Sequence, residues 1–251
     1  MPRYFASLKY KGSAYHGWQR QPNAISVQQV IEEAFSLLMK QPISVTGAGR
    51  TDTGVHADYF VLHFDVQETL SKLRQWVYRF NHILPGDIRV IHIIPVNEDA
   101  HARFDAISRT YKYIISREKD PFVKELVYPF SFPLDIEAMN YAASRLFAYH
   151  DFTSFSKLHT DVKTNNCKIL RSLWSEEKNQ MVFTISADRF LRNMVRAIVG
   201  TMLDVGRKKI SITEFEQLIK KRNRSEAGFS VPSSGLYLTG IEYPGHVFSI
   251  Q

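Results

Sequence analysis

The sequence predicts an α+β protein made of two halves, each with an antiparallel sheet and helices on one side of it. Segments with alternating or β-branched apolar residues are separated by segments with apolar residues at helical spacing. In residues 4–96 the order is β-α-β-β-α-β, which is the split βαβ arrangement. Residues 107–243 repeat this order with one extra helix. We therefore expect one domain over residues 1–104 and a second over residues 105–251.

Each element of the first half has its own local signal. Residues 4–10 alternate polar and apolar side chains, as half-buried strands do. Ser26 is the expected N-cap of a helix whose apolar residues recur every three or four positions up to residue 39. A second helical pattern covers residues 70–83. The remaining strands are predicted at 43–46, 59–66 and 88–96.

The second half begins with a strand on which Tyr111 and Tyr113 share one face, because side chains alternate along a strand. A helix predicted over residues 190–205 places Arg192 and Arg196 four positions apart, hence on one face. The other predicted elements are strands at 107–116, 168–174, 181–187 and 236–243, and helices at 133–150 and 213–221.

The composition excludes several classes of protein. With 44% hydrophobic residues the chain is not disordered, and a net charge of +7 favours a polyanionic partner. The single Cys167 excludes an internal disulfide, and no Cys/His spacing matches a zinc site. Neither a signal peptide nor an apolar stretch long enough to cross a bilayer is present. We expect a cytoplasmic protein with no metal and no membrane partner.

Two polar connections combine aromatic and basic side chains. Residues 11–23 include Trp18 and Arg20, and exposed aromatics among basic groups suit contact with RNA bases and phosphates. Packing in the core is an equally good interpretation of Trp18. Residues 150–166 include Lys157 and are too long for an ordinary connection, so we interpret them as an insertion that contacts RNA.

The densest chemistry lies in residues 45–59, which read VTGAGRTDTGVHADY. An Asp before Thr-Gly is common in turns, and that is the plain interpretation of Asp52. A phosphate-binding loop would need a GK[ST] ending, and an aspartic protease would need a second Asp-Thr-Gly or Asp-Ser-Gly; the chain has neither. A phosphotransfer aspartate would need a neighbouring acid for Mg²⁺, whereas the next acid is Asp58, beyond a Gly, a Val and a His.

The segment GRTDTGVHA, residues 49–57, resembles the signature of the tRNA pseudouridine synthase A (TruA) family, in which GRTD is followed by a small residue and GVHA or GVHG. The resemblance implies that Asp52 is the catalytic aspartate. RTYKYI resembles the family run whose first Tyr packs against the target base, here Tyr111. The Met-Val-Arg of a later helix implies that Arg196 reaches the aspartate, and Gly-Leu-Tyr-Leu implies that Leu236 lines the pocket.

The resemblance also implies a reaction and partners. The family isomerises uridine to pseudouridine at positions 38, 39 and 40 of the tRNA anticodon arm, without a cofactor, as a homodimer that holds tRNA across both subunits. Whether the aspartate attacks covalently or removes a sugar proton stays open. Because the uridine must leave its stack, Arg50 is expected to fill the vacated space or to hold a phosphate.

We further expect the two halves to be ferredoxin-like, as RNA-recognition modules are, with their sheets joined into one extended sheet and the active-site cleft between them. Affinity for tRNA is expected to come from Lys and Arg contacts with phosphates, and the candidates are Arg20, Lys157 and Arg192. The alternative hypothesis is an RNA-binding module or RNA chaperone on the same fold that has lost catalysis. Asp52, Tyr111 and Arg196 occurring together favour the enzyme.

Overall fold

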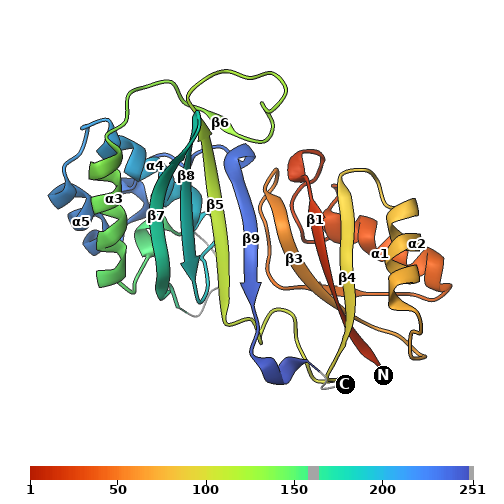
Figure 1. Cartoon of the computed structure of the whole chain (residues 1–251). Coiled ribbons are helices and arrows are strands. Elements are labelled where there is room, and N and C mark those ends of the chain that lie inside the picture. The colour runs from red at the N-terminus through yellow and green to blue at the C-terminus, as the bar shows by residue number, and fades with distance from the viewer. Residues whose placement is uncertain (158–163, 249–251) are drawn as a thin grey trace. The chain divides into compact units, whose positions relative to one another are not determined.

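The computed structural model describes residues 1–157 and 164–248 (Figure 1). The chain divides into two compact units. Unit 1 is Met1–Ser108 together with the C-terminal segment from Leu238, and unit 2 is Arg109–Tyr237. The α+β prediction is confirmed, because the described residues form mostly antiparallel strands and five α-helices. None of these helices combines the length and apolarity that crossing a membrane requires.

Unit 1 is organised around β1 (Arg3–Tyr10), which pairs antiparallel with β3 (His56–Asp65) on one side and β4 (Ile88–Val96) on the other. The short β2 (Val45–Gly47) pairs with β3. The register sets Tyr4 opposite Phe64 and Leu8 opposite Phe60, so these aromatic and aliphatic side chains lie on one face of the sheet.

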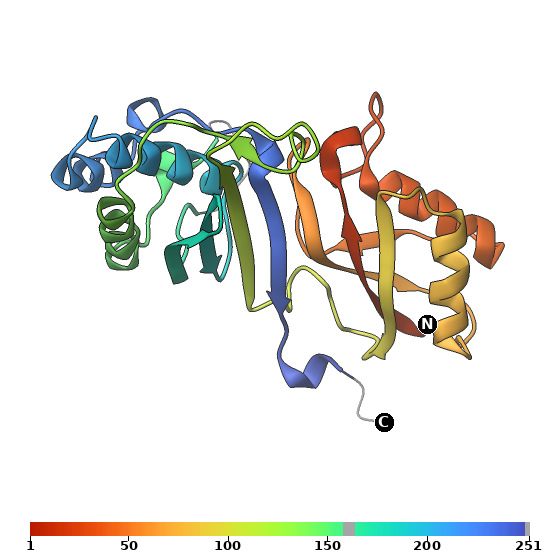
Figure 2. The same ribbon diagram turned by 45° about the horizontal axis from the view of Figure 1, so that its top comes forward.

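Two helices cover that face: α1 (Val27–Met39) and α2 (Leu73–Ile83). Phe35 of α1 stacks on Phe80 of α2 at 3.9 Å and meets Phe64 edge-on at 5.2 Å. The predicted cap of α1 is confirmed, since the Ser26 hydroxyl accepts the N–H of Gln29. Both views show α2 beside β4 (Figures 1 and 2). The apolar faces of both helices thus pack within unit 1.

The other face of β1 is also covered inside unit 1. Phe5 contacts the rings of His63, Tyr243 and Phe248, so the C-terminal segment packs onto the first strand. The Nδ1 atom of His63 accepts the backbone N–H of Ala102 at 3.0 Å, which makes this imidazole neutral. Burial, with the charge of Arg3 adding to it, lowers the pKa of His63 to about 4.

Unit 2 contains a second antiparallel set of strands. β8 (Gln180–Ala187) lies between β5 (Ser108–Ser116) and β7 (Ile169–Glu177), and β6 (Tyr128–Pro129) adds a short parallel pair to β5. β9 (Leu236–Glu242) begins in unit 2 and ends in unit 1.

Three helices belong to unit 2: α3 (Ile136–Arg145), α4 (Met194–Gly206) and α5 (Ile212–Lys221). Trp174 of β7 stacks on Phe183 of β8 at 4.9 Å, and its ring N–H points at the sulfur of Met202 on α4. In α4 all but two of the residues are buried, so this helix is the centre of the second core.

The start of α4 differs from its prediction. The helix begins at Met194 rather than at residue 190, because Asn193 takes the left-handed conformation at φ 67° and so interrupts the helical path. Arg192 therefore lies in the turn before the helix. The prediction that Arg192 and Arg196 share a helical face is wrong.

The long connection over residues 150–166 is partly a core element. Phe152 and Phe155 are completely buried, and Ser154 between them donates its hydroxyl to the carbonyl of Leu218 on α5. The same hydroxyl accepts the N–H of Asn223. The first part of the connection is thus anchored, whereas residues 158–163 of the predicted RNA-contacting insertion lie outside the described residues.

Candidate active site

Asp52 lies half-buried in the connection between β2 and β3. Its backbone carbonyl accepts the N–H of Val55 at 3.1 Å, which closes a four-residue turn. Gly54 is the third residue of this turn and has φ 77°, the positive value that a type II turn requires there. The turn interpretation of the motif is therefore correct as local structure, and the turn fixes the backbone that carries the carboxylate.

The backbone on both sides of Asp52 is held by the connection that follows β1. The N–H of Trp18 donates to the carbonyl of Thr51 at 3.2 Å, and the N–H of Gly54 donates to the carbonyl of Tyr15 at 3.3 Å. The side chains of Tyr10 and Thr51 share a buried hydrogen bond of 2.9 Å. Residues 10–18 thus form the support on which the aspartate loop rests.

The two segments touch backbone to backbone, which explains two glycines outside the signature. A Cβ on Gly12 would lie 2.0 Å from the carbonyl oxygen of Val55. A Cβ on Gly17 would lie 2.4 Å from the carbonyl oxygen of Thr51, and Gly17 also has φ 87°. Any side chain at either position would push the aspartate loop away from its support.

His56 of the signature is a structural residue. It is 1% exposed, and its Nδ1 atom accepts the N–H of Gly12 at 3.0 Å. A ring nitrogen that accepts a backbone N–H carries no proton, so the hydrogen is on Nε2 and the imidazole is neutral. The His of the motif therefore ties the end of the aspartate loop to the segment beneath it.

Trp18 is a core residue, which decides between the two interpretations of its position. It is 2% exposed and stacks on Phe60 of β3 with ring centroids 4.1 Å apart. A Cβ on Gly47 would lie 2.5 Å from the indole ring, so the glycine makes room for it. The indole fills the space under the loop and is not available to stack on an RNA base.

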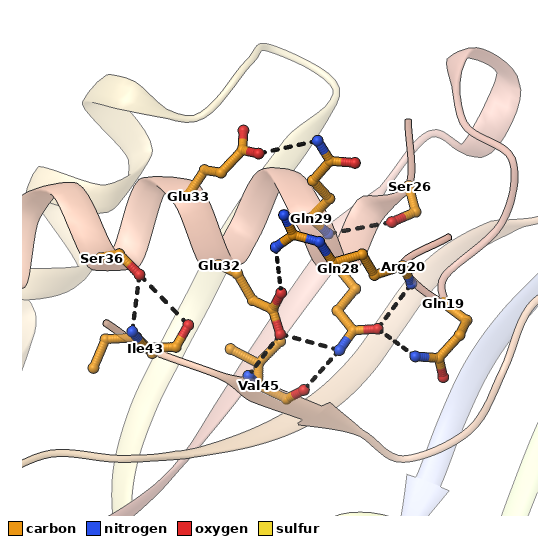
Figure 3. Close-up of polar contacts among 10 residues, drawn as sticks. All are labelled: Gln19, Arg20, Ser26, Gln28, Gln29, Glu32, Glu33, Ser36, Ile43 and Val45. Atoms are coloured by element: carbon orange, nitrogen blue, oxygen red, sulfur yellow. Dashed lines mark hydrogen bonds and ion pairs between the residues drawn. The ribbon is translucent and has the colours of Figure 1, made fainter. Parts of the chain in front are cut away.

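Arg50 is exposed and is tied to α1 through a chain of side-chain amides. Its Nε donates to Gln19 at 3.2 Å, Gln19 donates to Gln28 at 2.8 Å, and Gln28 donates to Glu32 at 3.1 Å. Arg20 forms an ion pair of 3.1 Å with the same Glu32 (Figure 3). Arg50 is therefore connected to α1 through Gln19.

In unit 2 the two tyrosines of β5 have different environments. Tyr113 is fully buried, and its hydroxyl donates to the carbonyl of Pro232 at 2.8 Å; burial raises its pKa. Tyr111 is half-buried and meets Phe190 edge-on at 5.1 Å. Core packing with a satisfied hydroxyl describes Tyr113, whereas Tyr111 is only partly buried.

Arg196 lies on α4, and Leu236 is the first residue of β9, the next strand along the chain. The Nε of half-buried Arg196 donates to the carbonyl of Val231 at 2.7 Å, and the N–H of Val231 donates back to the carbonyl of Arg196. Leu236 is 6% exposed and opens β9. The preceding Gly235 is required because a Cβ there would lie 2.8 Å from the Tyr113 ring.

The remaining predicted phosphate contacts divide between the units. Lys157 and Arg192 are both exposed and are joined by a backbone hydrogen bond of 3.0 Å, so the structure brings them together in unit 2. Arg20 lies in unit 1, as do Asp52 and Arg50. In the part of the chain that the structure describes, no three His, Cys, Asp or Glu side chains gather as a cation site.

Sequence reasoning missed Gly12, Gly17, His56 and Gln19 as parts of this site. Two of them, Gly12 and Gly17, carry a visible signal, because they flank Tyr15 and His16 in the letters GSAYHGW. The two glycines can be interpreted as points of close backbone approach only once the segment that packs against them, residues 51–55, is known.

Comparison with known proteins gives a family match that covers both the aspartate loop and the segment that supports it. The sequence model of a family described as tRNA pseudouridine synthase matches residues 6–105 and 142–244, which include Asp52, Arg196 and Leu236. The chain belongs to this family. The match also includes Gly12, Gly17 and His56, so the support of the aspartate loop is part of the family region.

Individual relatives in the family match over the full length of the chain. A protein of Parabacteroides distasonis named tRNA pseudouridine synthase A is 54% identical over 251 residues, which is all of both chains. One of Porphyromonas gingivalis with the same name is 53% identical and covers 99% of this chain and 100% of its own. One of Hydrogenovibrio crunogenus is 38% identical over 94% of this chain and 91% of its own.

Proposed function

We propose that this protein isomerises uridine to pseudouridine in the anticodon arm of tRNA, with Asp52 as the catalytic carboxylate. The observation that carries the proposal is the family match across both units, together with an aspartate loop that is braced on both sides by hydrogen bonds. A braced loop suits catalysis because a reacting group must be held to within a fraction of an ångström.

The reaction needs no external atoms. The bond from C1′ of the ribose to N1 of the base breaks, the base rotates, and a bond from C1′ to C5 forms. The C5 proton is lost and N1 gains a proton, so the product is an isomer of the substrate. An ionised Asp52 serves this chemistry either as a nucleophile or as the base that takes a sugar proton. No cofactor enters the scheme.

The other site residues are assigned from the family resemblance, and their environments are compatible with these roles. Tyr111 is only partly buried, which suits stacking on the target base. Arg196 keeps the role that the family resemblance implies, and within unit 2 its Nε donates to the carbonyl of Val231. Leu236 is the apolar residue that the resemblance implies for the uridine pocket. Arg50 holds the flipped nucleotide or fills its place in the stack, since the uridine must leave its duplex at a cost of a few kcal/mol.

Binding of tRNA rests on charge. The net charge of +7, with Lys157 and Arg192 side by side, suits contact with phosphates. We further propose that two copies hold one tRNA as a homodimer, in the cytoplasm. A lone, buried Cys167 agrees with a reducing compartment.

Release of tritium from tRNA labelled at C5 of uridine tests the proposal. Asp52→Ala is expected to abolish release while tRNA affinity stays within about threefold of the parent, because affinity comes mainly from phosphate contacts. The matched control is Asp58→Ala, which removes a carboxylate six positions away that is exposed and paired with Lys9. The control is expected to keep full activity.

Retained release in Asp52→Ala would refute the role of the aspartate. An unmodified chain that binds tRNA tightly and releases no tritium would instead support the alternative, an RNA-binding module or chaperone without catalysis. Thermal melting of both variants shows whether a loss of release is a loss of fold.

A further inference from the structure

The outer face of α2 is a cationic surface that the proposed chemistry does not use. Lys72 at its N-cap, then Arg74, Arg79 and His82, are all exposed. The helix itself contains no Asp or Glu, and its 11 residues span about 16 Å. The other four α-helices of the described residues all carry acids, namely Glu32 and Glu33 on α1, Glu137 on α3, Asp204 on α4, and Glu214 and Glu216 on α5.

These cations are not paired within the described part of the chain. No ion pair there involves Lys72, Arg74 or Arg79. By contrast, the basic end of α5 is neutralised, since Lys221 pairs with Glu226 and Arg222 with Asp151. Unpaired like charges on one helix repel each other, so the α2 face gains from any anion that approaches it.

Aromatic side chains order the charged groups of this face. The guanidinium of Arg79 lies 4.6 Å from the centre of the Trp76 ring, and the ring of Tyr78 lies 4.1 Å from that of His82. Tyr78 is 65% exposed. A cation spread over an indole and an exposed tyrosine are the groups that contact phosphates and sugars of a nucleic acid.

Hydrogen bonds and packing fix α2 against β4 and α1. The side chain of Asn81 donates to the carbonyl of Val90 on β4 and accepts its N–H, both at 2.8 Å. Phe80 on the inner side of α2 stacks on Phe35. The helix therefore holds its charges at fixed spacing, unlike a set of cations on a mobile loop.

The orientation of α2 argues for RNA and against a membrane. A helix that lies on a bilayer turns its apolar side outward into the lipid. Here the apolar side, with Phe80 fully buried, faces β4, and the polar cationic side faces solvent. A helix of this length can meet on the order of five phosphates of one strand, given one phosphate per 3.4 Å of axis.

We propose that the outer face of α2, defined by Lys72, Arg74, Tyr78, Arg79 and His82, binds the phosphate backbone of the tRNA substrate. This rests on the proposed function and adds to it a binding surface on the helix side of unit 1. The contact is with phosphates and carries no preference for base sequence.

The test compares two double variants of the full chain that lose the same charge. Arg74→Gln/Arg79→Gln removes two cations from the α2 face. Lys178→Gln/Lys220→Gln removes two exposed cations from the β7–β8 turn and from α5. Binding of an unmodified tRNA transcript is measured between 50 and 300 mM salt, and tritium release is measured at saturating tRNA.

Loss of two phosphate contacts should lower the slope of log K against log salt by about 1.4 to 1.8 and weaken binding at 0.1 M salt by about 25- to 60-fold. The control should change binding by less than about twofold. Turnover at saturating tRNA should stay at the parent level in both variants. Tritium release by the parent protein tests the proposed function separately.

An α2 variant whose affinity and salt slope match those of the control would overturn the inference, even with an active parent enzyme. So would a variant that binds tRNA normally but no longer binds vesicles containing phosphatidylserine, because the occupant would then be a membrane.

Discussion

Replacement of Gly12 by Ala tests whether the support of the aspartate loop determines catalysis. The added Cβ would lie 2.0 Å from the carbonyl oxygen of Val55 and 2.6 Å from its carbon. Since such atoms do not approach closer than 3.0 Å, Val55 must move by at least the difference, 1.0 Å. Val55 closes the turn that begins at Asp52, so the carboxylate moves with it.

Two magnitudes follow from that displacement. A 1 Å error in the position of a catalytic group costs about 100-fold in turnover. Overpacking of this kind costs about 1 to 3 kcal/mol of unfolding free energy, which for a chain of this size lowers the melting temperature by about 2 to 12 °C. Affinity for tRNA should be nearly unchanged, because Gly12 is buried and cannot itself meet a phosphate.

The assay separates turnover from binding. Tritium release at varied tRNA gives kcat and KM, and equilibrium binding gives the Kd of the same preparation. Gly245→Ala is the matched control in unit 1, because a Cβ there would have no atom within 4 Å and its φ is not positive. A Gly12→Ala protein with the turnover and melting temperature of the control would refute the claim that this contact positions Asp52.

Two further predictions follow from side chains that act at a distance. Gln19→Ala should lower kcat/KM by about 2- to 12-fold, which corresponds to one hydrogen bond, because Arg50 loses the acceptor of its Nε. The control Gln29→Ala, on the exposed side of α1, should have no such effect in the same steady-state assay. His63 has a pKa of about 4 in the fold against an ordinary 6.5, so the stability it contributes is complete above pH 6.5 and is lost as the pH falls toward 4, by about 3 kcal/mol. Urea unfolding across this range should show a shallower decline for His63→Asn, whose amide oxygen can take the place of Nδ1 and accept the Ala102 N–H. Identical pH profiles would contradict the assignment.

Local pattern was enough to identify most elements and the catalytic candidate. The strands β1 and β4 and the Ser26 cap of α1 follow from residues within a few positions of each other, and so does the turn around Asp52 and Gly54. Where a local conformation has a weak signal, the prediction failed: Asn193 in the left-handed region starts α4 four residues late and removes Arg192 from it. The chemistry of the motif could be predicted because its residues, 49–57, are contiguous in the sequence.

The placement of Trp18, the purpose of Gly12 and the tautomer of His56 depend on contacts between segments about 30 to 45 residues apart in the chain. The bond between Gln19 and Arg50 spans a similar distance along the chain, and the contact of Phe248 with Phe5 joins its two end regions, more than 240 residues apart. No periodicity encodes such contacts, because a side chain shows its own polarity and size but not the partner that folding brings to it. Whether an aromatic is core or surface, or a glycine a hinge or a point of close approach, is therefore decided by the packing of distant segments.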